Sequence, residues 1–161
     1  MISLVRVDNR LIHGQVVEAW LPRLRAQRMV VADDEAYETP LARAAMALAV
    51  PAHVAVQIEP LLGVDYAALA ENPDRTLLLF RELAGVLVAR EHGLKLTQLN
   101  LGNVHFAPGR RKVSDSVFLS QEELDQLKML VDQGVEVEAR GVPTDPRVDF
   151  ATMVERFGKG A

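Results

Sequence analysis

The chain of 161 residues contains no cysteine. This absence excludes disulfides, thiolate metal ligands and a cysteine nucleophile. Long apolar runs are missing too, because runs such as Leu77–Phe80 fall far short of the roughly 20 residues that a membrane-spanning helix needs. The first residues show no basic stretch followed by an apolar core, so we expect no signal peptide. The sequence therefore predicts a cytoplasmic protein.

An excess of positive charge is also lacking. Lys and Arg number 18 against 22 Asp and Glu, which gives a formal net charge of −4. A nucleic-acid-binding surface is normally basic, so we expect no nucleic-acid partner. The hydrophobic fraction of 49% is too high for a disordered chain, and the length suits one domain that folds without a metal or a disulfide.

Short apolar segments alternate with segments of helical periodicity along most of the chain. Seven short segments are predicted as buried strands: Ile2–Val7, Arg28–Ala32, Val54–Ile58, Arg75–Phe80, Gln98–Leu101, Ser116–Leu119 and Glu136–Arg140. Between them, apolar residues recur at steps of three and four, as in Val16, Val17, Trp20, Leu21 and Leu24. This order predicts an α/β fold, with a mostly parallel sheet and helices on both faces.

Local signals mark several helix ends. Ser120 to Glu123 form a capping box, and Gly134 is placed to end the helix that follows. The Ala-rich segment Leu41–Ala49 is predicted to be helical, with Pro51 after its end. We expect residues 147–161 to form a C-terminal connector, a short helix and a tail.

Ionisable and small residues gather directly after the predicted strands. Five segments occupy these positions: Asp8–Gln15, Asp33–Glu35, Arg81–Glu82, Gly102–Phe106 and Gly141–Asp145. In an open parallel sheet, ligands bind beyond the carboxyl ends of the strands. The sequence therefore predicts one functional edge.

The first of these segments carries the most chemistry. Arg10 has paired donors that suit phosphate oxygens, and the neutral imidazole ring of His13 can act as a nucleophile. Asp8 is placed to orient the ring or the guanidinium, and Gly14 opens the helix at whose N-terminus anions bind. A single histidine beside an apolar helix is, however, more often a packing or capping residue.

Structural interpretations compete for other residues as well. Asp33 and Asp34 either cap the next helix or bind a divalent cation, and His105 is either a site residue or a loop residue bonded to backbone. We interpret His53 and His92 as structural, since both lie away from the functional edge.

The run Val5–Val17, followed by Trp20, resembles the active-site signature of enzyme IIB in the mannose/fructose/sorbose family of the bacterial sugar phosphotransferase system. The resemblance continues through Val30–Glu35, Leu99–Phe106 and Val142–Asp145, in order and without a large insertion. It implies a three-layer α/β/α sandwich around a mostly parallel sheet of six to seven strands. It also implies a single IIB-type domain over residues 1–161.

The same resemblance implies a function. His13 would accept a phosphoryl group on Nδ1 from a phosphorylated IIA protein and pass it to a sugar held by the membrane components IIC and IID. Asp8 and Arg10 would orient and stabilise this group. The binding residues expected around them are Gly14, Gln15, Asp33, Asp34, Gly102, Asn103, His105 and Thr144. No metal or other cofactor is expected, because phosphoryl exchange between histidines needs none.

Two departures from the family pattern affect the details. Asn103 and Val104 stand where many relatives have a second glycine and a methionine, so this loop differs from the family pattern. No IIA domain is recognisable in the chain, so we expect the donor to act in trans.

Three alternative functions compete with this interpretation. A receiver-like phosphoacceptor needs an Asp at the end of the third strand and a Lys at the end of the fifth, where Glu59-Pro60 and Leu101-Gly102 stand. A dinucleotide-binding enzyme is disfavoured, because no Gly-x-Gly-x-x-Gly follows the first strand. A regulatory phosphoacceptor that uses His13 to tune a protein partner stays open. The sequence names neither the sugar nor the oligomeric state.

Overall fold

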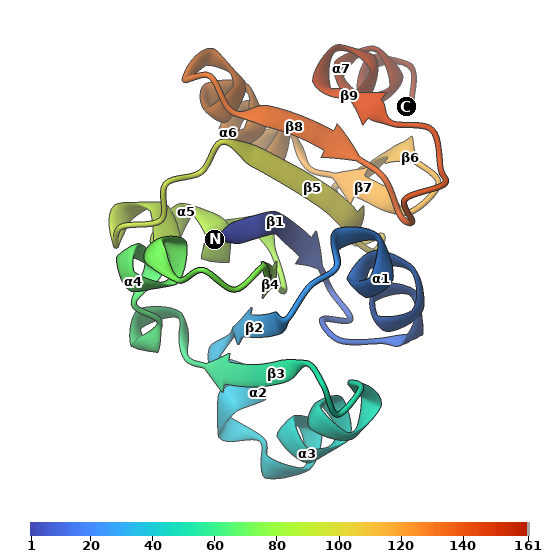
Figure 1. Ribbon diagram of the computed structural model, residues 1–161. Coiled ribbons are helices and arrows are strands. Elements are labelled where there is room, and N and C mark those ends of the chain that lie inside the picture. The colour runs from blue at the N-terminus through green and yellow to red at the C-terminus, as the bar shows by residue number, and fades with distance from the viewer. Residues whose placement is uncertain (161) are drawn as a thin grey trace.

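A computed structural model describes residues 1–160, and a seven-stranded sheet runs through it in the order β3-β2-β4-β1-β5-β8-β9 (Figure 1). Its strands are β1 (Ile2–Asp8), β2 (Arg28–Ala32), β3 (Ala55–Glu59), β4 (Thr76–Phe80), β5 (Gln98–Asn103), β8 (Glu136–Ala139) and β9 (Val148–Asp149). All of them are parallel except β9, which pairs antiparallel with β8. Six segments predicted as strands thus form the parallel part of the sheet.

Helices cover both faces of the sheet (Figure 1). One face carries the π-helix η1 (Val16–Trp20), α1 (Leu21–Leu24), α2 (Asp34–Glu38) and α3 (Pro40–Ala49). The other carries α4 (Tyr66–Glu71), α5 (Leu83–Glu91), α6 (Gln121–Asp132) and α7 (Phe150–Lys159), with the 3-10 turn η2 (Leu61–Gly63) beside them. The predicted three-layer α/β/α sandwich around a mostly parallel sheet is confirmed.

Alternation along β1 decides which of its side chains meets which helical layer. Val5 and Val7 belong to the larger core, under α4 to α7, whereas Leu4 belongs to the smaller core, under η1 to α3. Side chains two residues apart share a face of a strand, so Arg6 and Asp8 point into the layer of Leu4. Both are fully buried.

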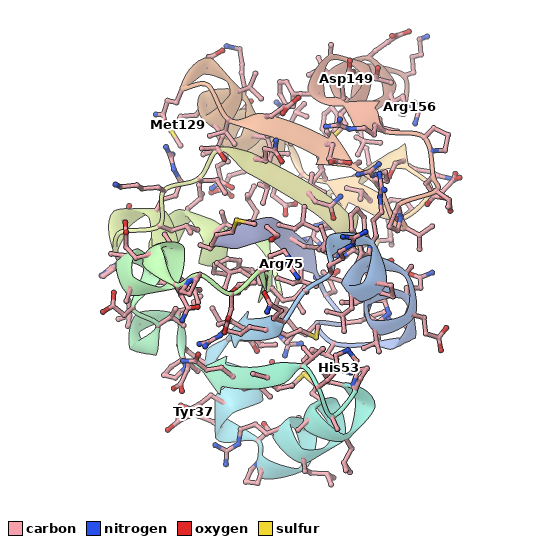
Figure 2. All side chains as sticks on the ribbon, viewed as in Figure 1. Tyr37, His53, Arg75, Met129, Asp149 and Arg156 are labelled. Atoms are coloured by element: carbon pink, nitrogen blue, oxygen red, sulfur yellow. The ribbon has the colours of Figure 1, made fainter. Side chains whose placement is uncertain are left out.

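The strand predicted at Ser116–Leu119 forms outside the main sheet. It is β7 (Val117–Leu119), and it pairs antiparallel with β6 (Arg111–Ser114) in a separate two-stranded sheet. The seventh strand of the main sheet is instead the short β9, within the segment predicted as a connector. Asp149 at the end of β9 caps α7 by accepting from the amide of Thr152, and Figure 2 places Asp149 beside this helix.

The strand order places a topological switch point at the carboxyl end of β1. From β1 the chain passes through η1 and α1, over one face, to β2. The strands on either side of β1 are β4 and β5. After each of them the chain passes over the opposite face, through α5 and α6 respectively. Loops that diverge to opposite faces leave room between them, and such switch points are where open α/β sheets bind ligands.

No helix within residues 1–160 is long and apolar enough to cross a membrane.

Candidate functional site

The loop that follows β1 is anchored by its apolar residues. Leu11 and Ile12 are buried in the smaller core, and Leu11 adopts a left-handed backbone with φ of 55°. Its amide donates to the carbonyl of Asp8 over 2.9 Å, which closes a tight turn. His13 comes next, and its carbonyl accepts from the amide of Val17 at 3.1 Å. His13 therefore sits at the start of the first helix.

The two ring nitrogens of His13 have different surroundings. Nε2 lies 2.8 Å from Oδ2 of Asp8, whereas Nδ1 has no hydrogen-bond partner within residues 1–160. The side chain is only 8% exposed. A carboxylate only accepts hydrogen bonds, so Asp8 favours the tautomer with the proton on Nε2. The lone pair then belongs to Nδ1, the nitrogen that the family resemblance marks as the acceptor.

Asp8 is the centre of the hydrogen-bond network. Its Oδ2 accepts from Nη2 of Arg6 and Nδ2 of Asn103, each at 2.9 Å, and its Oδ1 accepts from the amide of Arg10 at 2.9 Å. Burial alone would raise the pKa of Asp8. The hydrogen bond from His13, the charge of Arg6 and the bonds from Asn103 and Arg10 outweigh this effect and hold the pKa below its ordinary 3.8.

Arg6 is the site residue to which the sequence analysis assigned no role. Its guanidinium is fully buried, and Nη1 donates to Oδ1 of Asn100 at 2.7 Å and to the carbonyl of Arg140 at 3.1 Å. Burial lowers the pKa of Arg6, against the opposing charges of Asp8 and Glu138, but a guanidinium stays protonated in proteins. The missed signal is an arginine inside an otherwise apolar strand, two residues before Asp8.

Arg10, in contrast, extends away from this network. Its side chain is exposed and forms no hydrogen bond or ion pair with the described residues, although its amide binds Asp8. Gly14 and Gln15 are also exposed, in the first turn after His13. The position of a Cβ on Gly14 has no atom within 4 Å, so the helix start is open to an incoming group.

The carboxyl end of β5 supplies two of the expected residues. Asn103 binds Asp8 directly, and the preceding Gly102 packs so closely on Arg6 that a Cβ there would overlap the guanidinium. His105 is exposed, and its amide donates to Oδ1 of Asn9 in the loop after β1. This backbone contact joins the two loops, while the His105 ring takes no part in the Asp8 network.

Asp33 and Asp34 have structural partners instead. Asp33 caps α2 by accepting from the amide of Ala36 at 2.9 Å, and it pairs with Arg81 at 2.8 Å. Asp34 accepts from the amide of Leu61 at 2.8 Å. The capping interpretation of Asp33 is confirmed. Thr144 lies exposed in the loop after β8, and no hydrogen bond within residues 1–160 connects it to Asp8 or His13.

The residues interpreted as structural lie away from this site. His53 precedes β3 and is labelled near α3 in Figure 2.

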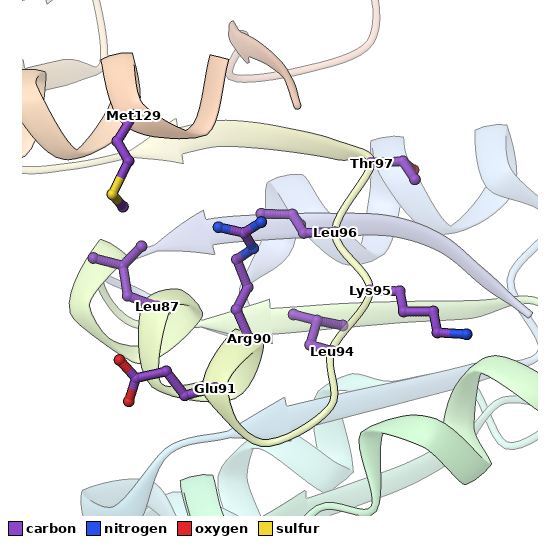
Figure 3. A pocket seen from close by; sticks show the side chains of 8 residues that line it. All are labelled: Leu87, Arg90, Glu91, Leu94, Lys95, Leu96, Thr97 and Met129. Atoms are coloured by element: carbon purple, nitrogen blue, oxygen red, sulfur yellow. The ribbon is translucent and has the colours of Figure 1, made fainter. Parts of the chain in front are cut away.

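A separate cavity of about 550 Å³ opens between α5 and α6, where Leu87 and Met129 face one another (Figure 3). Leu94 to Thr97 line it just before β5 begins, which places it at the amino ends of the strands. None of the predicted site residues lines this cavity.

Comparison with known proteins adds independent information. Residues 2–160 match the family described as "PTS system sorbose subfamily IIB component". The sorbose-specific EIIB component of Lacticaseibacillus casei is 31% identical over 99% of each chain. The mannose-specific EIIAB component of Escherichia coli (strain K12) is 30% identical over 99% of this chain and 50% of its own length. The chain thus spans about half the length of this curated relative.

Solved structures agree with these sequence matches. The manxB structure from Thermoanaerobacter tengcongensis is 30% identical, covers 98% of this chain and 96% of its own, and superposes with a TM-score of 0.85. The IIBSor domain of the sorbose permease from Klebsiella pneumoniae is 28% identical over 96% of each chain, with a TM-score of 0.84. With the family match over residues 2–160, these likenesses show that the chain belongs to the sorbose subfamily of IIB components of the sugar phosphotransferase system.

Proposed function

We propose that His13 is the phosphoryl carrier of this IIB component. Its Nδ1 accepts a phosphoryl group from the phosphohistidine of a IIA protein and passes it to a sugar bound by the membrane components IIC and IID. The observation that carries the proposal is the asymmetry of the ring, with Nε2 bonded to Asp8 and Nδ1 unpartnered within residues 1–160. Residues 1–161 act as one IIB domain.

In the first step, the lone pair of Nδ1 attacks phosphorus, the P–N bond to the donor histidine breaks, and a P–N bond to His13 forms. The proton stays on Nε2, where Asp8 offsets the positive charge that develops on the ring. In the second step, the oxygen of a sugar hydroxyl attacks phosphorus and the hydroxyl proton passes to solvent or to a base on the membrane components. The P–N bond to His13 breaks, and its electron pair returns to Nδ1. Because phosphoryl transfer needs little covalent chemistry from the protein, positioning and charge stabilisation suffice.

Arg10 and the start of the first helix act on the phosphoryl oxygens. The Arg10 guanidinium is exposed and unengaged by the described residues, so it is free to form a bidentate contact. The first turn after His13 presents backbone N–H groups at the positive end of a helix dipole. Both groups stabilise the negative charge that the transferred group brings.

Incubation with a phosphorylated IIA protein, followed by mass spectrometry, tests the proposal. We expect one phosphohistidine, at His13, that is labile in acid and stable in base. His13→Ala should lose the label and remain folded, whereas His105→Ala, the matched control, should keep the label. Label on His105 or on a carboxylate such as Asp34 would overturn the assignment.

A further inference from the structure

We infer that Arg6 is a positioning residue for phosphoryl transfer, held in a cage by Gly102, Trp20 and Asn100, and that it acts on His13 through Asp8. The inference rests on the proposed function and adds to it. Arg6 is fully buried, so neither a phosphoryl group nor a protein partner can touch it. Its direct contacts are therefore limited to the protein residues around it, and Asp8 is the one of these that also contacts His13.

The guanidinium is fixed by four hydrogen bonds. Nε and Nη2 both point at Oδ2 of Asp8, at 3.2 and 2.9 Å, and Nη1 binds Asn100 and the carbonyl of Arg140. The register of the sheet explains the meeting, because Arg6 of β1 lies directly opposite Asn100 of β5. These bonds fix both the place and the plane of the guanidinium.

Trp20 and Gly102 pack against the Arg6 guanidinium and restrict its position. The Trp20 ring centre lies 5.3 Å from Cζ of Arg6, and the indole N–H donates to the carbonyl of Gly141 at 2.8 Å. Gly102 packs against Cζ and both terminal nitrogens, where any larger residue would overlap them. A cationic group over an aromatic face is attracted to it, so Trp20 both confines and stabilises Arg6.

The cage matters because Arg6 and His13 share one oxygen atom. Oδ2 of Asp8 accepts from both, at 2.9 Å from Nη2 of Arg6 and 2.8 Å from Nε2 of His13. A shift of Arg6 would therefore turn the carboxylate and, with it, the ring and the direction of Nδ1. Lysine would keep the charge but lose the planar fork that fixes this orientation.

Two variants test the positioning role of Arg6, one at each residue of the contact between Arg6 and Gly102. Arg6→Lys removes the fork, and Gly102→Ala displaces the guanidinium without altering it. In each we expect the maximal rate of transfer from a phosphorylated IIA protein to fall about 10- to 100-fold, as for a misplacement of about 1 Å. The half-saturating concentration of the donor should not change, because Arg6 is buried. Arg28→Lys, in an ion pair with Asp74 at the start of β2, is the matched control and should transfer at the parental rate.

A readout that needs no donor separates positioning from a purely structural role. In ¹⁵N NMR spectra, the parent His13 ring should show the tautomer protonated on Nε2. We expect a mixture of tautomers in Arg6→Lys and in Gly102→Ala. If either variant fails to fold, Trp20→Phe serves as the milder substitution, since it keeps an aromatic ring beside Arg6 while it removes the bond to Gly141 and reduces the size of the ring. It should cause a smaller shift in the same direction.

The outcomes distinguish the two proposals. A parent protein that takes no label on His13 would refute the proposed function, whatever the variants do. A labelled parent, together with folded Arg6→Lys and Gly102→Ala variants that transfer at the parental rate and keep the Nε2 tautomer, would overturn the role of Arg6 alone.

Discussion

Asp8 links every charged group at the centre of the site. It is buried, yet it accepts hydrogen bonds from Arg6, Arg10, His13 and Asn103. A carboxylate that accepts several bonds is held in its ionised form, which explains the lowered pKa despite burial. The Asp8 side chain thereby fixes the tautomer of His13 and neutralises the buried charge of Arg6.

The lowered pKa gives Asp8 a signature in acid. Its pKa in the folded protein lies below the ordinary 3.8, so its stabilising contribution is complete above pH 3.8 and is lost as pH falls through the folded value. We expect Asp8→Asn to be less stable than the parent at neutral pH, by about 3 kcal/mol or more, because Arg6 is left buried and unpaired. Below pH 3.8 this gap should shrink, by up to about 1.4 kcal/mol per pH unit.

Urea unfolding of both proteins across this pH range measures the gap. The other carboxylates are common to both proteins, so their contributions cancel. A gap that stays constant or widens in acid would contradict an ionised Asp8.

Arg10→Lys separates charge from geometry at the exposed side of the site. If the guanidinium grips two phosphoryl oxygens, Lys loses one of the two bonds and the fixed orientation. We expect the transfer rate to fall by about 10²–10³, as for the removal of one donor at a reacting oxyanion. Stability should change by less than about 0.5 kcal/mol, because the side chain is exposed and unpaired among the described residues.

The measurements are the transfer rate from a phosphorylated IIA protein and thermal melts of both forms. Transfer at close to the parental rate would mean that the fork is not used. A much lower melting temperature would make Arg10 a structural residue.

At this scale the sequence indicates the candidate site residues more readily than the residues that support them. His13 and Asp8 were identified because ionisable groups after a strand are conspicuous and match a long motif. Arg6 was missed because its importance comes from Asn100, Gly102 and Arg140, which are distant in sequence and meet it only through strand register. Asn103 departs from the family pattern, and the structure assigns it a bond to Asp8 that no spacing rule implies.

Among the elements, η1 differs most from its prediction. The apolar stripe from Val16 to Leu24 predicts an α-helix, but Val16–Trp20 form a π-helix before α1 begins. Single π-turns often occur at functional sites, and this one sets the direction of Trp20, which lies over Arg6. A stripe at steps of three and four does not distinguish the two helix types over so short a segment.

The helix α6 shows the opposite case, a local signal that decides the outcome. The predicted capping box is confirmed, since Ser120 Oγ accepts from the amide of Glu123 and Glu123 accepts in return from the amide of Ser120. We expect Ser120→Ala to lower the free energy of unfolding by about 1 kcal/mol, as is typical for the loss of a cap. Urea unfolding measures it, with Gln121→Ala as control at the next, exposed position. Equal effects of the two variants would contradict the capping role.

The short strands β6 and β9 escaped prediction for a physical reason. β9 has two residues and β6 has four, too few for an alternating pattern to stand out. Each also forms only by pairing with another strand, β6 with β7 and β9 with β8. The local sequence does not encode where that partner lies in space.

For the whole molecule, the fold is predictable because the same pattern of apolar strand and amphipathic helix recurs along the chain. Six apolar strands with helical segments between most of them specify a parallel sheet, and an error in one element leaves the others intact. The division of each strand into two faces follows from the same alternation, and it explains why Arg6 and Asp8 lie together under Trp20.

We expect the isolated chain not to bind free hexoses measurably. Sugars often stack on exposed tryptophan and tyrosine rings, but the one tryptophan and Tyr66 are buried here. The more exposed rings, Tyr37 at 39% and Phe106 at 66%, come from different segments of the chain. Calorimetry with unphosphorylated hexoses should detect no binding tighter than about 1 mM, or about −4 kcal/mol. Micromolar affinity would contradict the assignment of the sugar site to the membrane components.

The unpartnered Nδ1 of His13 has a kinetic consequence. Under the proposed function, one atom on a ring that is 8% exposed would serve both the phosphoryl donor and the sugar acceptor, so the two would have to bind there in turn. Under the proposed function, the reaction therefore follows a ping-pong scheme, with parallel lines in double-reciprocal plots. Excess unphosphorylated IIA protein should compete with the acceptor for the phosphorylated chain. The rate of transfer to the sugar should therefore fall as the concentration of unphosphorylated IIA protein rises.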